Sequence, residues 1–232
     1  MEDDRAIPDQ NRARKILDVL AQTVEPLALA LGEGCEVVVH DLTNLENSSY
    51  AIGGGVTGRT VGSPPTDLLL RHVLSGAKSN IVGYATKLPG GREGRSSTII
   101  VRDPVNDSAV AALCLNIDVT SVRQAHRLLG SLLNADPDSV AAAQPEVPSE
   151  VFPRTVSELT TQMVNEVIGS TGIPVELMKK SHKLDVVAAL NQPGVFQVKE
   201  AVENVASALD VTRFTIYNYL NELQERSLEG IS

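Results

Sequence analysis

The chain has 232 residues, 42% of them hydrophobic and 21% charged, which is enough for one large or two modest folded domains. It holds 20 Lys and Arg residues against 29 Asp and Glu, and the formal charge of −9 argues against a protein that binds polyanions regardless of sequence. It has no apolar run long enough to span a bilayer, no secretory signal and only two cysteines, so we expect a cytoplasmic protein without a disulfide framework or a membrane partner.

The first third of the chain alternates between helical and extended patterns. Apolar residues recur every three or four positions in the first segment, where Pro26 should either kink the helix or begin a second one. Thr66 stands where it can cap the second helix. The patterns predict helices at 12–31 and 67–74, and strands at 35–42, 48–52 and 80–86.

The next stretch predicts a hairpin followed by a helix. Residues 89–97 (PGGREGRSS) read as a flexible Gly/Arg loop, and 98–102 and 109–119 read as paired strands. A helix at 119–133 would place several apolar residues along one side: Val122, Leu128, Leu129 and Leu132. Short strands mixed with short helices predict a small α+β sensor domain over residues 1–133.

The C-terminal third differs in composition. Residues 134–153 carry four prolines and few side chains that could be buried, so we expect a semi-rigid or disordered linker. Helical spacing then returns at 156–168 and 184–190 and predicts an all-α domain over 154–232.

The most informative stretch of that domain is 202–223, whose apolar residues fit two short helices separated by a sharp break. Asp210 marks the break, because Asp is one of the few residues other than glycine that adopts the left-handed conformation. Thr212 follows in the N-cap position of the second helix. This pattern predicts a helix-turn-helix with its core at 198–224.

The exposed face of the second predicted helix carries side chains suited to DNA. Arg can bind a phosphate or a guanine edge, Asn pairs with adenine, and Tyr can donate to a phosphate. We expect direct base contacts from Arg213, Tyr217 and Asn218 and phosphate contacts from Thr212 and Lys199. The full candidate DNA-binding set is Thr212, Arg213, Phe214, Tyr217, Asn218, Asn221 and Lys199.

An alternative is that the terminal helices form a dimer interface in a sensor or adaptor that binds protein. The charge favours this alternative, because residues 151–232 hold seven Lys and Arg against ten Asp and Glu. With so few phosphate neutralisers, DNA affinity should depend on base contacts and on dimerisation, with a modest dependence on salt.

Four segments give the chain a resemblance to the YheO-like family of bacterial transcriptional regulators: EVVVHDL, AIGGGVTGR, LCLNID and VTRFTIYNYLNE. The resemblance implies a PAS-like sensor domain joined to a helix-turn-helix, in a family that includes D-arginine utilisation repressors. It therefore implies a repressor that binds a double-stranded operator as a homodimer and responds to a small effector such as an amino acid or a related metabolite. Asp210 departs from the glycine that is common at the turn.

Polar residues at the ends of two predicted strands are candidates for the effector site. His40, Asp41, Asn116 and Asp118 interrupt apolar strands, as residues lining a small-molecule pocket do. Strand alternation places Asn116 and Asp118 on one face with Cys114. The alternative is that each of the four only satisfies backbone groups at a turn or strand end.

No pattern in the sequence supports catalysis, a metal site or a cofactor. Residues 53–60 approach a phosphate-binding loop, but the glycines and prolines that follow cannot form the helix it needs. The four histidines lack the spacing of metal ligands, and the two cysteines read as small buried apolar residues. We therefore expect a regulator without enzymatic activity.

Overall fold

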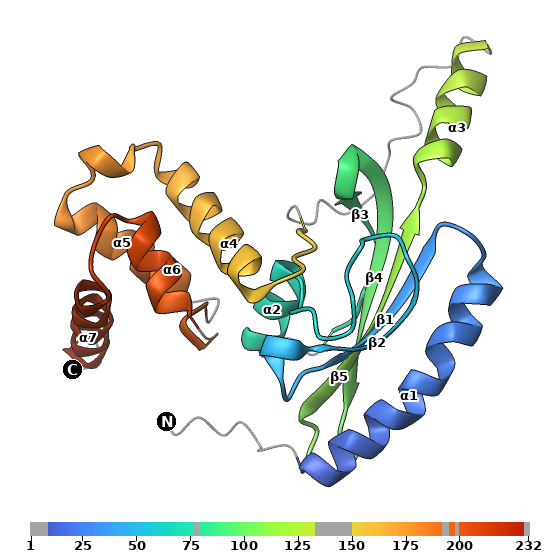
Figure 1. The fold of residues 1–232 in the computed structure, drawn as a ribbon, viewed down its shortest axis with the longest axis horizontal. Coiled ribbons are helices and arrows are strands. Elements are labelled where there is room, and N and C mark those ends of the chain that lie inside the picture. Colours follow the sequence, from blue (N-terminus) through green and yellow to red (C-terminus); the bar gives the residue numbers. More distant parts are fainter. Residues whose placement is uncertain (1–8, 77–78, 133–149, 192–194, 198–199, 230–232) are drawn as a thin grey trace.

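The computed structural model describes residues 9–76, 79–132, 150–191, 195–197 and 200–229. Its N-terminal part, the sheet region, is built on one five-stranded antiparallel sheet with the strand order β2-β1-β5-β4-β3 (Figure 1). The fold class expected from the sequence is confirmed. The strands are β1 (Cys35–Asp41), β2 (Ser49–Gly54), β3 (Ile81–Leu88), β4 (Arg92–Arg102) and β5 (Ala109–Asp118).

Helices cover the two faces of this sheet unequally. The long helix α1 (Gln10–Leu31) lies across the outer face, continuous through Pro26, and packs Leu17 and Val24 against Val37 and Val39 of β1 (Figure 1). The short helix α2 (Asp67–Leu74) covers part of the inner face, capped by Thr66 as expected. After β5, α3 (Thr120–Leu132) projects away from the sheet.

The expectation of a flexible loop at 89–97 is wrong. Only Pro89–Gly91 form a turn, and β4 begins at Arg92, so the arginines and serines that follow belong to a paired strand. A Cβ at Gly94 would lie 2.6 Å from Thr86 Cγ2, so glycine at this position allows the close packing of β4 on β3. Glycine here reflects close packing within a strand, which composition alone cannot distinguish from a loop.

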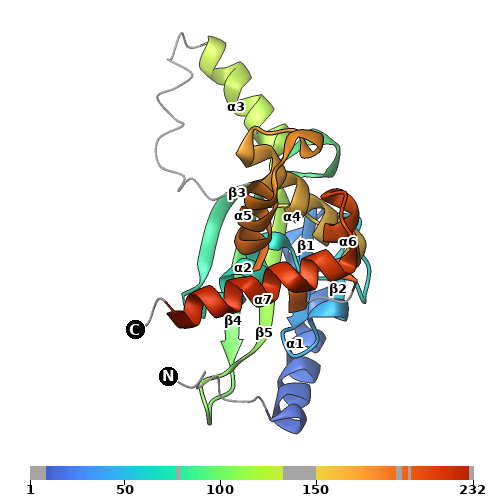
Figure 2. The same cartoon turned by 90° about the vertical axis from the view of Figure 1, so that its left-hand side faces the viewer.

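The C-terminal part, the helical region, packs around its own apolar core. Leu159 and Val164 meet Val187, Leu190 and apolar side chains of the last two helices. The helices are α4 (Val156–Thr171), α5 (Lys180–Asn191), α6 (Ala201–Ala208) and α7 (Arg213–Glu229). Figure 1 shows α7 at the end of this region that is remote from the sheet, and Figure 2 shows α7 on the surface from that side. Short 3-10 turns are Leu45–Asn47, Pro89–Gly91, Val175–Leu177 and Val195–Gln197. Within the described ranges, no helix combines the length and the apolarity needed to cross a bilayer.

The two regions meet at α2. Leu70 is fully buried within the core of the helical region, and the guanidinium of Arg71 bridges Asp67 of its own helix and Glu166 of α4. Helix α2 therefore contributes to the packing of both regions.

The end of the predicted linker also packs against the sheet region. Residues 133–149 lie outside the described part of the chain. Glu150, Phe152 and Pro153 are buried, although little of this segment was expected to be. An apolar ring and a carboxyl group in a Pro-rich stretch thus serve as packing groups.

Asp210 closes the turn between α6 and α7 in the left-handed conformation, with φ of +50°. The Asp210 N–H donates to Ser207 O and the Val211 N–H donates to Ala206 O, which together form a Schellman motif. Thr212 then caps α7, as predicted, through a 3.3 Å hydrogen bond from the Thr215 N–H to its hydroxyl. The helix-turn-helix geometry thus follows from two local backbone devices.

Replacing Asp210 by Gly should stabilise the protein by about 0.5–1 kcal/mol, because glycine adopts positive φ without the steric penalty that Asp carries. Urea unfolding followed by circular dichroism measures the gain. Asp210→Asn is the matched control, since it removes the charge and keeps the side chain. An equal gain in both variants would assign the effect to charge and contradict the conformational account.

Candidate functional site

The predicted DNA-reading residues lie on the exposed side of the first turns of α7. Ile216 and Tyr219 are buried in the core, whereas Phe214 is 69% and Tyr217 51% exposed. The guanidinium of Arg213 lies 5.5 Å from the centre of the Phe214 ring. Thr212, Arg213, Asn218 and Asn221 are exposed as well. The structure therefore places these six on an accessible face, in the first half of a capped helix.

Two basic residues near this face, Lys180 and Lys183, are bonded to other groups of the helical region. Lys183 Nζ donates to the Leu209 carbonyl at 2.7 Å, at the C-terminus of α6, and Lys180 pairs with Glu222 of α7 at 2.9 Å. Lys199, a predicted phosphate contact, lies outside the described residues. The positive charge available at this face is therefore centred on Arg213.

A buried carboxylate organises the inner face of the sheet. Glu36 of β1 accepts hydrogen bonds from the backbone N–H groups of Val56 and Thr57, at 3.0 and 2.8 Å. It also accepts from the Thr57 hydroxyl at 2.8 Å and from Asn116 Nδ2 at 3.1 Å. These bonds fix the loop after β2 against β1 and β5. Both oxygens of this buried carboxyl group thus have hydrogen-bond partners.

Arg59 follows in the same loop, and its side chain is fully buried. Its Nη2 lies 3.9 Å from Glu36 Oε1, its Nε donates to Thr57 Oγ1 at 3.4 Å, and its guanidinium lies 5.5 Å from the centre of the Phe152 ring. Neither Nη1 nor Nη2 has a hydrogen-bond partner among the described residues. A buried cation with free donors is costly to maintain, so it is a candidate for binding an anion.

The four predicted pocket residues divide into two pairs. His40 and Asn116 are buried on the inner face, where Asn116 also accepts from Ser96 at 2.8 Å, and His40 Nδ1 lies 2.9 Å from Ser48 Oγ. Asp41 and Asp118 lie at strand ends. Asp41 accepts from the Thr43 N–H at 2.8 Å, and Asp118 pairs with Arg92 and accepts from the Thr120 N–H. Asp41 and Asp118 thus satisfy backbone groups next to the ends of their strands, which is the alternative role that the sequence allows.

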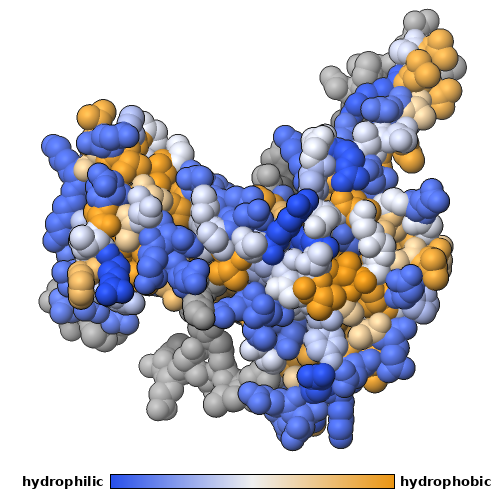
Figure 3. Space-filling view, viewed as in Figure 1, coloured by the Kyte–Doolittle hydropathy of each residue, from blue (hydrophilic) through white to orange (hydrophobic). Residues whose placement is uncertain are grey.

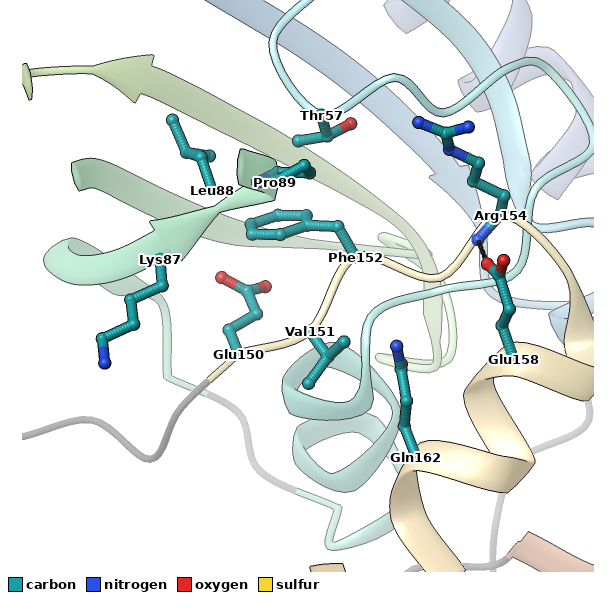
Figure 4. Close-up of a pocket in the computed structure, with 10 residues that line it drawn as sticks. All are labelled: Thr57, Lys87, Leu88, Pro89, Glu150, Val151, Phe152, Arg154, Glu158 and Gln162. Atoms are coloured by element: carbon teal, nitrogen blue, oxygen red, sulfur yellow. Dashed lines mark hydrogen bonds between the residues drawn. The ribbon is translucent and has the colours of Figure 1, made fainter. Parts of the chain in front are cut away.

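Residues 150–154 run along a cleft of about 300 Å³ between the sheet region and α4 (Figure 4). Thr57, Leu88 and Pro89 line one side, whereas Arg154, Glu158 and Gln162 line the side toward α4. Phe152 packs against Val56 and Leu88, and the same ring contacts Arg59, so one side chain of the cleft lining touches the buried guanidinium.

Glu150 reaches the inner face from this segment. Its Oε1 accepts from the Thr66 hydroxyl at 2.8 Å. Its Oε2 has no hydrogen bond of good geometry among the described residues, although the Tyr84 hydroxyl faces this carboxyl group. The next N–H, of Val151, donates to Asp67 at 2.8 Å. Burial raises the pKa of Glu150 to about 7. Burial, helped by the charge of Arg59, lowers the pKa of His40 well below its usual value, so this ring is neutral at physiological pH.

Sequence analysis missed Glu36, Arg59, Glu150 and Phe152. A signal existed for the first, because Glu36 and His40 alternate with Val38 on one face of an otherwise apolar strand. Arg59 was weighed only as part of a phosphate loop, and the other two lie in the predicted linker. Their proximity depends on tertiary packing between distant segments.

Replacing Glu150 by Gln should remove part of the pH dependence of stability. The folded pKa of Glu150 is about 7 and the usual value is 4.5, so the folded state keeps a proton that the unfolded chain releases. Its contribution is full below pH 4.5, falls as the pH rises to 7, and then stays constant. We expect similar melting temperatures for both proteins near pH 5 and a more stable variant at pH 8, by a difference on the order of 3 kcal/mol.

Thermal unfolding followed by circular dichroism at the two pH values measures this effect. The charged or titratable groups facing Glu150 are unchanged in the variant: Arg59, Asp67, Tyr84 and Cys114. Glu176→Gln is the control, since Glu176 is exposed. A difference between the Glu150→Gln variant and the wild type that does not vary with pH would contradict a protonated buried Glu150.

Comparison with known families accounts for both regions of the chain. Residues 11–134 match the model of the YheO-like PAS domain, and residues 159–221 match the model of an HTH domain. The uncharacterised protein YheO of Escherichia coli is 29% identical over 220 residues, covering 93% of this chain and 88% of that protein. The transcriptional regulator DauR of Pseudomonas aeruginosa is 28% identical over 220 residues, covering 94% and 96%.

Similarity to solved structures is much weaker. The phage VqmA–DPO complex aligns with 9% identity and a TM-score of 0.33 over 90% of each chain, and at that level it does not bear on fold or function. The family models do bear on fold and function, because the first spans more than half of the chain and the second covers the helix-turn-helix. The chain belongs to the family with a YheO-like PAS domain, joined here to a helix-turn-helix domain, and is a DNA-binding transcriptional regulator.

Proposed function

We propose that this regulator binds a pseudo-palindromic operator as a homodimer, acts as a repressor, and changes its DNA affinity when a small polar metabolite binds the inner face of its sheet. The observation that carries the DNA-reading part is the face of α7 formed by Arg213, Phe214, Tyr217 and Asn218, which is exposed at the start of a capped helix. Aromatic side chains of this size are rarely left exposed without a partner.

The side chains of this face divide into two kinds of contact. Asn218 and Arg213 can make bidentate bonds to adenine and guanine edges, and Tyr217 can contact a phosphate or a thymine methyl group. Because Lys180 and Lys183 have partners within the protein, few cations remain for phosphates. Sequence discrimination should therefore exceed non-specific affinity, and dimerisation should supply much of the total binding energy.

Helix α3 supports the homodimer. None of its residues is buried, and its exposed apolar side chains include Val122 at 69%, Leu129 at 59% and Leu132 at 72%. With Ala125 they follow the three-four-three spacing of a coiled-coil seam. Figure 3 shows apolar atoms gathered on this projecting helix. A second copy of α3 would cover this seam, and dimerisation would set the spacing of the two α7 helices near 34 Å, one turn of DNA.

The small-molecule part of the proposal is supported by the inner face. His40, Arg59, Thr86 and Glu150 all carry buried polar atoms without a partner among the described residues. Such atoms gathered on one face of a sheet are typical of a site for a polar ligand. A ligand can shift DNA affinity only by binding two conformations unequally, and α2 connects this face to the helical region.

Replacing Asn218 by Ala should relax base preference at one position of the operator by about 1–3 kcal/mol, because one bidentate adenine contact is lost. Replacing Arg213 by Ala should weaken binding about tenfold or more, since it removes the main cation of the face. Binding-site selection measures the base preference, and mobility shifts at two salt concentrations, on the DNA upstream of the protein's own gene, measure the affinity.

Lys15→Ala is the matched control, because it removes an exposed charge from the distant helix α1. Unchanged sequence preference in Asn218→Ala would remove that residue from the readout. If the wild type fails to bind any DNA at either salt concentration, the alternative of a protein-binding adaptor is favoured. Lower promoter activity after deletion of the gene would make the protein an activator.

Replacing Leu129 and Leu132 together by Glu should convert the dimer to a monomer and weaken operator binding at least tenfold, because like charges would face each other across the seam. Light scattering coupled to size exclusion measures the mass. Ser131→Glu places a charge on a different side of α3 and should leave the dimer intact. An unchanged mass in the double variant would place the dimer interface elsewhere.

A further inference from the structure

The inner face carries a buried cation, Arg59, that is suited to binding an anion. Arg59 carries a full positive charge inside the protein, where its side chain is 0% exposed. Its nearest carboxylate, Glu36, is already engaged by Val56, Thr57 and Asn116, and lies 3.9 Å away, beyond hydrogen-bond distance. The two terminal nitrogens of the guanidinium therefore have no hydrogen-bond partner within the described part of the chain. Paired guanidinium donors match the geometry of a carboxylate.

The chain itself places a carboxyl group on the same inner face, within electrostatic range of this guanidinium. Glu150 is buried there with the Tyr84 hydroxyl facing its carboxyl group, and burial raises its pKa to about 7. Because Glu150 keeps a proton up to a pH of about 7, exchanging it for an incoming carboxylate would add negative charge to the inner face, which the positive charge of Arg59 would balance. The exchange would also give the free guanidinium donors a partner.

The route to Arg59 passes Phe152. This ring lies against Arg59 on one side and packs beside Leu88, which lines the open cleft of Figure 4, on the other. Phe152 and Glu150 belong to one short segment, held by the hydrogen bonds to Thr66 and Asp67 at the start of α2. A single movement of this segment would uncover the guanidinium and release both bonds.

We propose that the effector is a small carboxylate, which pairs with Arg59 and takes the place of the Glu150–Phe152 segment on the inner face. The proposal rests on the sensing function above and adds the chemical class of the ligand and the group that recognises it. Because the displaced segment leads directly into α4, occupancy of the site alters the anchoring of the helical region.

Thermal shift of the full-length protein with matched pairs of ligands tests this directly. The probes are aliphatic, amino and 2-oxo monocarboxylic acids of up to six carbons, each compared with its primary amide. We expect at least one acid to raise the melting temperature saturably, and its amide to have no effect. Arg59→Met should weaken the binding of that acid at least tenfold. Arg59→Lys should weaken it less, because Lys keeps the charge but not the paired donors.

A second variant guards against misfolding as the explanation. Phe152→Ala loosens the covering segment and removes the ring from the guanidinium while Arg59 itself is kept, so the variant should bind the same acid more tightly than the wild type does. Val82→Ala, at an exposed position of β3, is the matched control and should leave affinity unchanged. Tighter binding cannot result from loss of fold. Weaker or unchanged binding in Phe152→Ala would overturn the displacement of the segment.

Operator mobility shifts with the same preparations separate this inference from the proposed function. A neutral compound that changes operator binding, with no acid active, would overturn the carboxylate assignment and leave the sensing function standing. If an acid binds through Arg59 but the protein binds no DNA, the carboxylate assignment stands and the proposed function is overturned. If no acid stabilises the protein, or if Arg59→Met binds as well as the wild type, the inference is wrong.

Discussion

The architecture of the sheet region depends on one buried carboxylate. Glu36 accepts the N–H groups of Val56 and Thr57 and the amide of Asn116, and so joins β1, the loop after β2, and β5. Without these donors, a charge at this depth would be strongly destabilising. The same bonds fix the backbone that leads to Arg59, which places a cation opposite the carboxylate that organises the loop. Polar bonding on the inner face and apolar packing on the α1 face thus give the two faces of one sheet different functions.

The connection between the regions is built in a comparable way. Glu150 and Val151 are held by the first two residues of the α2 helix start, Thr66 and Asp67, while Arg71 further along α2 reaches Glu166. The polar inner face of the sheet region is thereby joined to the helical region. The joint combines these charged and polar residues with one apolar contact, made by Leu70 in the core of the helical region.

Features with a local cause were predictable from the sequence. The caps at Thr66 and Thr212, the left-handed turn at Asp210 and the exposed face of α7 all depend on residues a few positions apart. Residues 92–97 were misread because glycine and arginine resemble a loop in composition, although Gly94 is needed for strand packing. Arg59 and Phe152 could not be paired from the sequence, because only the folded sheet brings the loop and the segment after residue 149 together. Strand alternation indicated the face on which Asn116 lies, whereas the hydrogen bonds of Asp41 and Asp118 to neighbouring turns became visible only in the structure.

Helix α2 is short, and this has a mechanical consequence. Its eight residues extend about 12 Å, so its two ends behave as the ends of one rigid lever. One end begins at the cap that holds Glu150, and Leu70 near the middle is embedded beside Leu159 and Met163 of α4. A small tilt of α2 at its cap would therefore be transmitted to the helical region through packed side chains.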